Sequence, residues 1–398
     1  MTAAPVSPTR SPAEPLHVFL IAAEESGDRL GAALMRALKE RTAGTIRFSG
    51  LGGHGMAGEG LASLFPIDEL SITGFSAIPR RLPAILRRIR QAADAVQAAR
   101  PDVLVIIDSP DFTHRVARRV RGADPAIPIV DYVSPSVWAW RPGRARAMRQ
   151  YVDHVLALLP FEPEVHQQLG GPACSYVGHP VIECVQALRP NTEDALRRNS
   201  EPPLLLVLPG SRRNEIRWML GIFEQTVGIM AKEFGTLELA LPTVPHLYDA
   251  LRQATADWAI KPSIVFDPEQ KNAAFRRARA ALAKSGTVTL ELALAGIPTV
   301  AAYRLSAFEG WVARRLMRVP SVILANLVLK ENVVPEFIQE ACTPDALARA
   351  LTPLLADTPE RRRQLEAFSR LDEIMDVGAA APARRAADIV LAMARRRG

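Results

Sequence analysis

Residues 101–108 read PDVLVIID, which places five consecutive apolar residues between two aspartates. An unbroken apolar run of this length is typical of a strand in a parallel sheet whose two faces are both covered by helices. A second such run, IPIVDYV at 127–133, follows a helical stretch at 112–121. The succession of strand, helix and strand predicts a βαβ unit, from which α/β folds are built.

The same alternation continues toward both ends of the chain. Before this unit, LHVFLIA at 16–22 predicts a strand and residues 29–41 predict a helix. After it, a polar and proline-flanked stretch at 186–203 interrupts the rhythm, which resumes with LLLVLP at 204–209. Further strands are expected at LELALP near 240, SIVF near 265, AALA near 281 and PTVAAY near 300.

We therefore expect an α/β protein with two Rossmann-like, doubly wound domains that face a cleft. The expected parts are a disordered tail at 1–15, an N-terminal domain at 16–185, a linker at 186–203, a C-terminal domain at 204–345 and helices at 346–398 that pack back across both domains. In open sheets of this kind, ligands bind beyond the carboxyl ends of the strands. Chemistry is therefore to be sought in the loops that follow strands.

The composition is that of a globular protein with a basic excess. Of the 398 residues, 48% are apolar and 23% are charged, and the net charge is +7. This charge favours an anionic partner, such as a nucleic acid, a phosphorylated small molecule or an anionic membrane. Three cysteines without CxxC spacing argue against a disulfide framework or a cysteine zinc site and fit a reducing cytoplasm. Because no apolar run reaches membrane-spanning length and no signal peptide is recognisable, we expect no transmembrane segment.

Two strand-following loops in the N-terminal half carry carboxylates. In the first, Gly27 permits a tight turn, and its neighbours either cap the next helix or face a polyhydroxylated ligand; the residues concerned are Glu24, Ser26, Gly27 and Asp28. In the second, Asp111 is either a helix N-cap or a ligand contact. Asp108 ends an apolar strand, where a carboxylate needs a partner, and it could accept a proton from a substrate hydroxyl.

Two loops in the C-terminal half suit anions. In LPGSRRNEI at 208–216, backbone N–H groups near Ser211 and the guanidinium of Arg212 could form an anion site; the alternative is a solvated arginine. In KSGTVTLE at 284–291, a helix N-terminus could bind phosphate and Glu291 could reach a ribose hydroxyl. The turn before Glu291 consists of Ser285, Gly286 and Thr287.

These loops predict a nucleotide ligand and no metal ion. The first turn lacks GxGxxG, which argues against a dinucleotide, and the missing upstream glycines exclude a P-loop. No Asp-x-Asp pair occurs, which argues against a metal-bridged pyrophosphate, and no histidine has metal-site spacing. We therefore expect no cofactor. Ser134 and Trp138, in SPSVWAW at 134–140, either pack in the core or line the cleft.

An apolar stretch at 65–78 precedes a basic helical pattern. Its membrane-facing candidates are the apolar residues Phe75, Ile78, Leu82, Ile85, Leu86 and Ile89 and the basic residues Arg80, Arg81, Arg87 and Arg88. A basic amphipathic segment suits the interface of an anionic bilayer, and the alternative is a surface helix docked on its own domain. No aromatic residues interleave these arginines, so we expect no nucleic-acid partner.

Taken in order, the motifs from about residue 17 to 345 resemble those of the lipid-A-disaccharide synthase family. They are AEESGD, GLGGHGM, PDVLVIIDSPDF, YVSPSVWAWRPGR, LPFEPE, VGHP, LPGSR and SGTVTLE. The resemblance implies the type B glycosyltransferase fold and the transfer of 2,3-diacylglucosamine from UDP to the 6-hydroxyl of 2,3-diacylglucosamine 1-phosphate. It also implies a monomer or homodimer in the cytoplasm that associates peripherally with the inner face of the inner membrane.

The resemblance also assigns roles within the site. Asp108 would be the general base, with Asp111 and Glu24 orienting the acceptor or the sugar. Arg212 and the amides at 285–287 would neutralise the departing UDP, Glu291 would hold the ribose, and Asn326 would lie in the donor site. Some residues depart from the family pattern and bear on acyl-chain preference and acceptor fit: Ala23, Glu25, Thr113 and Ala325.

Two rival interpretations share these features. A UDP-sugar epimerase would have the same fold and donor site, but it would act on free UDP-N-acetylglucosamine and would not need a basic apolar face. A non-catalytic, membrane-bound nucleotide-sugar binder would bind UDP without turnover. Retention of both Asp108 and Arg212 argues against the binder.

Overall fold

The structure is a computed structural model that describes residues 15–70, 78–234, 236–306, 310, 315 and 319–396, with the backbone alone for 78–81 and 234. The chain forms two units of the kind expected. The first combines Met1–Pro180 with Ala379–Gly398, and the second is Val181–Gly378. The expected disordered tail lies outside the described residues except for Pro15. No helix in the described part of the chain is both long and apolar enough to cross a membrane.

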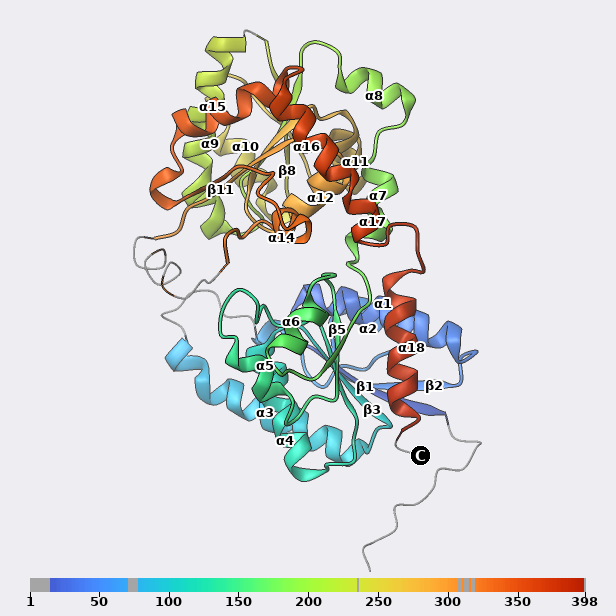
Figure 1. Ribbon diagram of the computed structural model, residues 1–398. Coiled ribbons are helices and arrows are strands. Elements are labelled where there is room, and N and C mark those ends of the chain that lie inside the picture. Colours follow the sequence, from blue (N-terminus) through green and yellow to red (C-terminus); the bar gives the residue numbers. More distant parts are fainter. Residues whose placement is uncertain are drawn as a thin grey trace, which may run out of the picture. The chain divides into compact units, whose positions relative to one another are not determined.

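The first unit is built on a six-stranded parallel sheet with the order β2-β1-β3-β4-β5-β6 (Figure 1). Its strands are β1 (Leu16–Ala22), β2 (Ile46–Leu51), β3 (Val103–Ile107), β4 (Ile129–Tyr132), β5 (His154–Ala157) and β6 (Ala173–Tyr176). Its helices are α1 (Glu25–Arg41), α2 (His54–Gly58), η1 (Ile67–Leu70), α3 (Ile78–Ala99), α4 (Pro110–Ala123), α5 (Gly143–Met148), α6 (Glu162–Gln168) and α18 (Pro382–Ala394).

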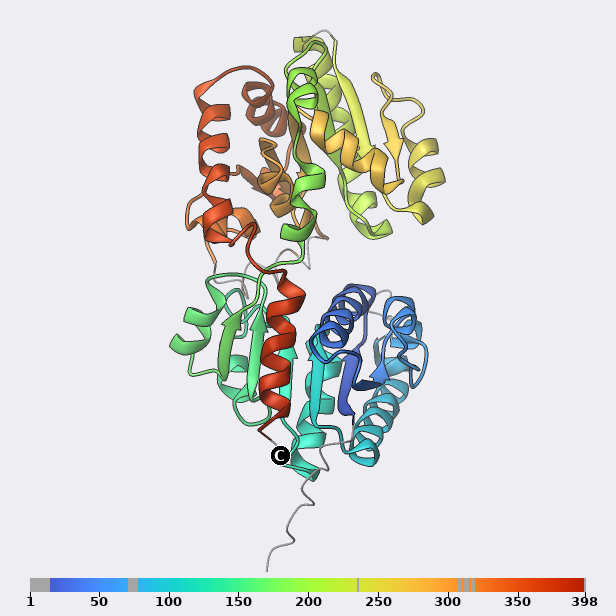
Figure 2. The same cartoon turned by 90° about the vertical axis from the view of Figure 1, so that its right-hand side faces the viewer.

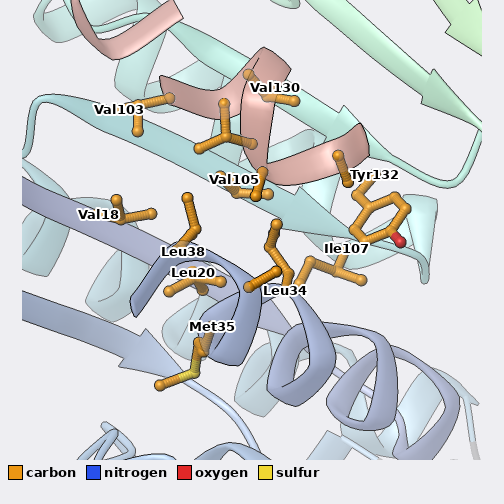
Figure 3. Packing of buried hydrophobic residues seen from close by; sticks show 14 of the residues in the cluster. Val18, Leu20, Leu34, Met35, Leu38, Val103, Val105, Ile107, Val130 and Tyr132 are labelled. Atoms are coloured by element: carbon orange, nitrogen blue, oxygen red, sulfur yellow. The ribbon is translucent and has the colours of Figure 1, made fainter. Parts of the chain in front are cut away.

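Apolar side chains of these strands fill a core on each face of the sheet, as the unbroken runs predicted. Val103, Val105 and Ile107 of β3 point to the face covered by α1 and α18 (Figure 3). Leu104 and Ile106 point to the opposite face, where α3 and α4 pack. Successive strand residues point to opposite faces, so a strand that is apolar throughout serves both cores.

The C-terminal helix α18 belongs to this first unit. It lies along α1 and the sheet (Figure 2). Its Val390 is buried in the core that α1 covers. Two ion pairs join the helices, Arg41 with Asp388 and Arg384 with Glu40. The first unit is therefore completed by residues that follow the whole second unit in sequence.

The second unit contains another six-stranded parallel sheet, with the order β12-β11-β10-β7-β8-β9. Its strands are β7 (Leu204–Leu208), β8 (Glu238–Pro242), β9 (Ser263–Val265), β10 (Ala280–Lys284), β11 (Thr299–Tyr303) and β12 (Glu336–Ile338). Its helices are α7 (Val181–Leu188), α8 (Thr192–Arg198), α9 (Arg213–Phe234), η3 (Pro245–Leu247), α10 (Tyr248–Ala254), α11 (Pro268–Arg277), α12 (Val288–Leu294), α14 (Leu324–Leu329), η4 (Gln339–Ala341), α15 (Pro344–Leu355), α16 (Pro359–Ser369) and α17 (Leu371–Ile374).

The boundaries of this unit differ from the expected ones in two places. The stretch expected as a linker, 186–203, contains the end of α7 and all of α8, and Arg198 of α8 is buried against carbonyl groups of the same unit. Of the helices expected at 346–398, α15, α16 and α17 lie in the second unit and only α18 lies in the first. The polar helix α8 is attached to the second unit by the hydrogen bonds of the buried Arg198. A hydropathy pattern does not reveal such contacts.

Candidate active site

Asp108 stands directly after β3, at the carboxyl edge of the first sheet. Its φ of 52° and the φ of 46° at Ser109 are left-handed, a conformation that non-glycine residues seldom adopt and that clusters at functional sites. The turn presents a half-buried carboxylate with both oxygens hydrogen-bonded. Ser109 N donates to Oδ1 at 2.8 Å, and Ser26 Oγ donates to Oδ2 at 3.1 Å. Thr113, which replaces an asparagine of the family pattern, donates to the Asp108 carbonyl at 2.7 Å and supports the turn.

The loop after β1 brings Ser26 to Asp108. Gly27 lies inside α1 and not in a turn, which corrects the expectation for this residue. A Cβ there would lie 3.2 Å from the carbonyl oxygen of Ile107, so glycine is what lets α1 approach β3. Glu24 immediately precedes α1, is exposed and makes no capping hydrogen bond with its side chain. The structure thus brings Ser26 and Asp108 together and leaves Glu24 open to solvent.

Asp28 and Asp111 have different surroundings. Asp28 is buried, and its carboxylate accepts from the backbone N–H groups of Gly53, Gly55 and Met56 at 2.7–3.0 Å. It therefore holds the GLGGHGM loop in place. Asp111 is exposed in the first turn of α4, where Ser109 occupies the N-cap position, and Asp111 lies 3.2 Å from the guanidinium of Arg144. The N-cap alternative for Asp111 is therefore wrong.

Ser134 and Trp138 follow β4, the strand beside β3. Ser134 is buried, and its Oγ lies 2.8 Å from Nε2 of His166. Trp138 donates from Nε1 to the buried carboxylate of Glu162 at 3.1 Å. Sequence reasoning missed both His166 and Glu162 as site residues. Their four-residue spacing in FEPEVH was the available signal, because such residues share one face of a helix.

In the second unit, the turn after β7 holds a carboxylate of its own chain. The backbone N–H groups of Ser211 and Arg212 donate to Oε2 of Glu215 at 3.0 and 3.3 Å. Oε1 of Glu215 accepts from Lys284 Nζ at 3.0 Å. The side chain of Arg212 is exposed. The amides of the expected turn therefore contact a carboxylate of the same unit, and Lys284 at the end of β10 adds a cation that the sequence analysis did not assign.

The loop between β10 and α12 places the predicted nucleotide-binding residues near this lysine. Ser285 is buried and donates from its backbone N to the carbonyl of Ala302 at 2.9 Å, and Gly286 and Thr287 then lead into α12. Glu291 of α12 pairs with Lys271 of α11 at 2.9 Å. These residues lie at the carboxyl edge of the second sheet, where the rule for open sheets places ligands.

Asn326 is buried and fully hydrogen-bonded within the second unit. Its Oδ1 accepts from the backbone N–H groups of Val333 and Val334 at 3.0 and 2.9 Å. Its Nδ2 donates to Ser321 Oγ and to the Val334 carbonyl. The contacts with Val333 and Val334 hold the segment after α14, and the contact with Ser321 holds the segment before it, so the amide of Asn326 supports the loops on both sides of this helix.

The expected membrane-facing helix α3 divides into two faces. Leu82 is 41% exposed, Leu86 is 37% exposed and Arg87 is also exposed. Ile89 is buried in the core of the first unit and Ile85 packs against that core, which corrects the assignment of these two residues to the membrane side. Arg88 is likewise turned inward and pairs with Glu69. The remaining candidates fall outside the described residues or side chains: Phe75, Ile78, Arg80 and Arg81.

Among the described residues, no cluster of histidine, cysteine, aspartate or glutamate side chains is arranged to hold a metal ion.

Comparison with known proteins extends these observations to the whole chain. A family model described as lipid-A-disaccharide synthetase matches residues 18–390. A lipid-A-disaccharide synthase of Rhodopseudomonas palustris (strain HaA2) is 63% identical over 379 residues, which cover 95% of this chain and 96% of that protein. One from Nitrobacter winogradskyi is 62% identical over 374 residues and covers 94% of each chain.

Solved structures share the fold at low identity. The UDP-GlcNAc 2-epimerase of Neisseria meningitidis, bound to UDP-GlcNAc, is 11% identical with a TM-score of 0.60 and covers 95% of this chain and 100% of its own. MurG of Acinetobacter baumannii is 16% identical with a TM-score of 0.57 and the same coverage. These likenesses establish the type B glycosyltransferase fold. With the family match over nearly its full length, the chain belongs to the lipid-A-disaccharide synthase family of glycosyltransferases.

Proposed function

We propose that the chain transfers 2,3-diacylglucosamine from UDP-2,3-diacylglucosamine to the 6-hydroxyl of 2,3-diacylglucosamine 1-phosphate in one inverting displacement. The acceptor oxygen bonds to C1 of the donor sugar as the bond from C1 to the diphosphate oxygen breaks. The hydroxyl proton passes to Asp108, and UDP leaves with the electron pair. The products are the β-1,6 disaccharide 1-phosphate and UDP. The names of the relatives, which match along nearly the whole chain, support these substrates.

The observation that carries the mechanism is the carboxylate of Asp108 at the end of a buried strand. A general base must lie within hydrogen-bond reach of the proton that it removes. The turn holds Asp108 at the carboxyl edge of the sheet, and the hydrogen bond from Ser26 Oγ fixes the direction of one carboxylate oxygen. Glu24 and Asp111, both exposed near this turn, then orient the acceptor or the sugar.

The leaving diphosphate would be stabilised from the second unit. Arg212, the turn at 285–287 and Lys284 supply positive charge and backbone N–H groups. The Glu215 carboxylate, which accepts from the amides of Ser211 and Arg212, occupies the position suited to a phosphate oxygen. Glu291 would hold the ribose, and Asn326 would act on the donor site through the loop that it supports.

The proposed transfer needs no metal ion or other cofactor. The sequence has no Asp-x-Asp pair to bridge a metal to the diphosphate. The charge that develops on UDP is instead met by Arg212 and Lys284, which act as electrostatic partners of the leaving group. Activity should therefore persist in a chelator.

The substrates also suggest where the enzyme works. Both carry acyl chains and negative charge, so an enzyme that uses them gains by resting on an anionic leaflet. We propose peripheral association with the inner face of the inner membrane, from the cytoplasm, through the exposed Leu82, Leu86 and Arg87 of α3. The working form is proposed to be a monomer or a homodimer, without nucleic acid.

The direct test is UDP release from UDP-2,3-diacylglucosamine in detergent micelles containing EDTA, with and without the acylated sugar 1-phosphate. Acceptor-dependent release with formation of the disaccharide is expected. Release that requires added magnesium would contradict the metal-independent mechanism. UDP binding without release would favour the non-catalytic binder, and conversion of UDP-N-acetylglucosamine would favour the epimerase, which is similar in fold alone.

A further inference from the structure

Helix α6 presents two buried titratable side chains, one turn apart, to the segment that follows β4. Glu162 is 3% exposed and His166 is fully buried. The Glu162 carboxylate accepts from Trp138 Nε1 at 3.1 Å, and Nε2 of His166 lies 2.8 Å from Ser134 Oγ. Both ends of the segment 134–138 are therefore attached to one helix.

The Glu162 carboxylate also joins this segment to a second loop. While Oε1 accepts from Trp138, Oε2 accepts from the backbone N–H groups of Leu158 and Leu159 at 3.1 and 3.0 Å. An ionised carboxylate accepts on both oxygens, whereas a glutamine side chain accepts on one and donates from the other end. Only the ionised acid serves the indole and the two amides at once. The Trp138 ring also packs edge-to-face on Phe161, with centroids 5.5 Å apart.

The attached segment begins beside the proposed base. Asp108 N donates to the carbonyl of Tyr132, the last residue of β4, at 3.0 Å. The next residue, Val133, has a φ of 89°, which is strained for a β-branched side chain and persists only where the surroundings enforce it. The contacts from α6 lie immediately after this strained residue, so they are placed to hold it.

We propose that Glu162 and His166 are positioning residues for acceptor binding, which hold Ser134 and Trp138 beside Asp108 through an ionised Glu162 carboxylate. The proposal rests on the function proposed above. Neither residue needs to touch the reacting atoms. Their effect is to fix the shape of the acceptor edge, where a displacement of about 1 Å can cost on the order of 100-fold in rate.

The clamp formed by Glu162 and His166 should respond to pH. Burial raises the pKa of Glu162 to about 7, against the opposing effect of its hydrogen bonds from Leu159, Trp138 and Leu158, and the charge of Asp131 raises it further. The titratable groups that act on it from other elements are Asp131 of β4 and Cys174 of β6, and His166 lies one turn along the same helix. Burial lowers the pKa of His166, which Asp131 opposes. Below about pH 7, the carboxylate is therefore protonated and one of its acceptor sites is lost.

Glu162→Gln and Trp138→Phe test the clamp through kinetics. Each is expected to lower kcat/KM for the acceptor about tenfold at pH 8, with the KM for the UDP-sugar unchanged. Combining them should cost less than the product of the two separate losses, because both act on the contact between Trp138 and Glu162. Glu164→Gln, on the exposed side of the same helix, is the matched control and should behave as wild type.

The pH profile separates positioning from a general loss of structure. Wild-type kcat/KM for the acceptor should fall as the pH drops through 7, and Glu162→Gln should lack this step. Wild-type kinetics and an unchanged acidic limb in Glu162→Gln would overturn the proposal. If Glu162→Gln fails to fold, Trp138→Phe still tests the hydrogen bond, because it keeps the aromatic ring.

A readout without substrate keeps this inference separate from the proposed function. The indole N–H resonance of Trp138, identified by its loss in Trp138→Phe, should shift with a midpoint near pH 7 and should not shift in Glu162→Gln. A resonance that does not titrate would overturn the clamp. Absence of acceptor-dependent UDP release would instead refute the proposed function, while this titration would still report on Glu162.

Discussion

Asp108 has two properties that a general base requires. Its side chain stands at the carboxyl edge of the first sheet, and its orientation is fixed by Ser26 and by the backbone N of Ser109. In Asp108→Asn, the amide oxygen can still accept a hydrogen bond, but the side chain can no longer take the acceptor's proton. We expect kcat to fall by about 10² to 10⁴.

UDP affinity, measured by calorimetry, should be unchanged in Asp108→Asn, because the residue lies in the unit that does not carry the proposed diphosphate contacts. Turnover within a few-fold of wild type would remove Asp108 from the role of base. Ser26→Ala provides a graded comparison. It keeps the carboxylate and loses one orienting hydrogen bond, so its defect should be smaller.

Protonation of Glu162 should have opposite effects on stability and on the proposed acceptor binding. The protonated form is favoured by folding, whereas the ionised form is proposed to hold Ser134 and Trp138. Its pKa rises from 4.5 in the unfolded chain to about 7 in the folded one, so folding favours the protonated form. The stabilising contribution is therefore complete below pH 4.5 and is lost as the pH rises through 7. Relative to Glu162→Gln, the wild-type Tm should fall between pH 5 and pH 8 in thermal scans. A Tm difference that stays constant over this range would show that the pKa of Glu162 is not raised.

At this scale, sequence reasoning found Asp108, whose signal is local in the sequence, and missed residues whose role depends on partners that are distant in sequence. Asp108 was predictable because a carboxylate directly follows an apolar strand. Lys284 and Glu162 were not, because their partners are distant in sequence; Lys284 pairs with Glu215, 69 positions away. Asn326 and Asp28 were predicted as ligand-site residues from family motifs. In the structure, their side chains accept hydrogen bonds from backbone N–H groups of their own unit.

Among the elements, the short helix α8 depends on the buried guanidinium of Arg198. This side chain donates to the carbonyls of Phe275 and Arg276 at the end of α11 and to that of Gly296 just after α12. Burial lowers its pKa to about 10, so it remains charged at neutral pH. It therefore satisfies carbonyl groups at the ends of two helices at once.

Arg198→Met keeps much of the side-chain volume and removes these donors. The free energy of unfolding of the second unit should fall by about 2–4 kcal/mol, because several buried carbonyl groups lose their hydrogen-bond donors. Urea titration followed by circular dichroism is the measurement. The exposed Arg197→Met is the control, and equal stability of the two variants would contradict the capping role.

Helix α3 makes a separate prediction for membrane binding. Leu82→Gln with Leu86→Gln removes exposed apolar surface, and Arg87→Glu reverses a neighbouring charge. The triple variant should lose most of its sedimentation with vesicles rich in phosphatidylglycerol, and wild-type binding should weaken with salt. The control is Lys232→Glu, an exposed position on α9 of the second unit, which makes the same change of charge and should leave sedimentation unchanged. Undiminished sedimentation of the triple variant would contradict a membrane role for α3.

The strands were easier to predict than the connections between them. Unbroken apolar runs identified β3 and β7, as expected for strands buried on both faces, and β4 was identified although it contains the buried Asp131. The three-residue strand β12 lies at the edge of its sheet and has no such run. Helix α8 was interpreted as a linker because its composition is polar, although a single buried arginine integrates it.

At the scale of the whole molecule, the stability of the first unit should depend on α18, which follows the second unit in sequence but packs in the first. A chain that ends at Gly378 lacks α18 and uncovers apolar residues packed beneath it, among them Leu34 and Leu38 of α1. Burial of large aliphatic side chains contributes about 1.5–3 kcal/mol each, so the first unit should unfold at a much lower temperature. Calorimetry should show two transitions, of which only one shifts. A single transition in both proteins would show that the two units unfold together.

The two-domain architecture and the reaction class followed from sequence motifs that are spread along the chain. The position of α18 in the first unit could not be predicted in this way, because the sequence of an amphipathic helix does not indicate which sheet the helix will cover. Val390 and Met393 read as apolar residues at helical spacing, and only their burial in the first core reveals their place. The ion pairs of Arg41 and Glu40 with α18 add specificity that no local pattern encodes.

Because α18 follows the whole second unit in sequence, the first unit cannot close its core while the ribosome is still making the second. Until α18 is synthesised, apolar residues of the core that it covers together with α1 remain partly exposed in the nascent chain. Such exposed apolar surface is prone to aggregation. A prematurely terminated product never receives its covering helix. Such fragments should be recognised by proteases and chaperones, so little protein that lacks α18 should accumulate.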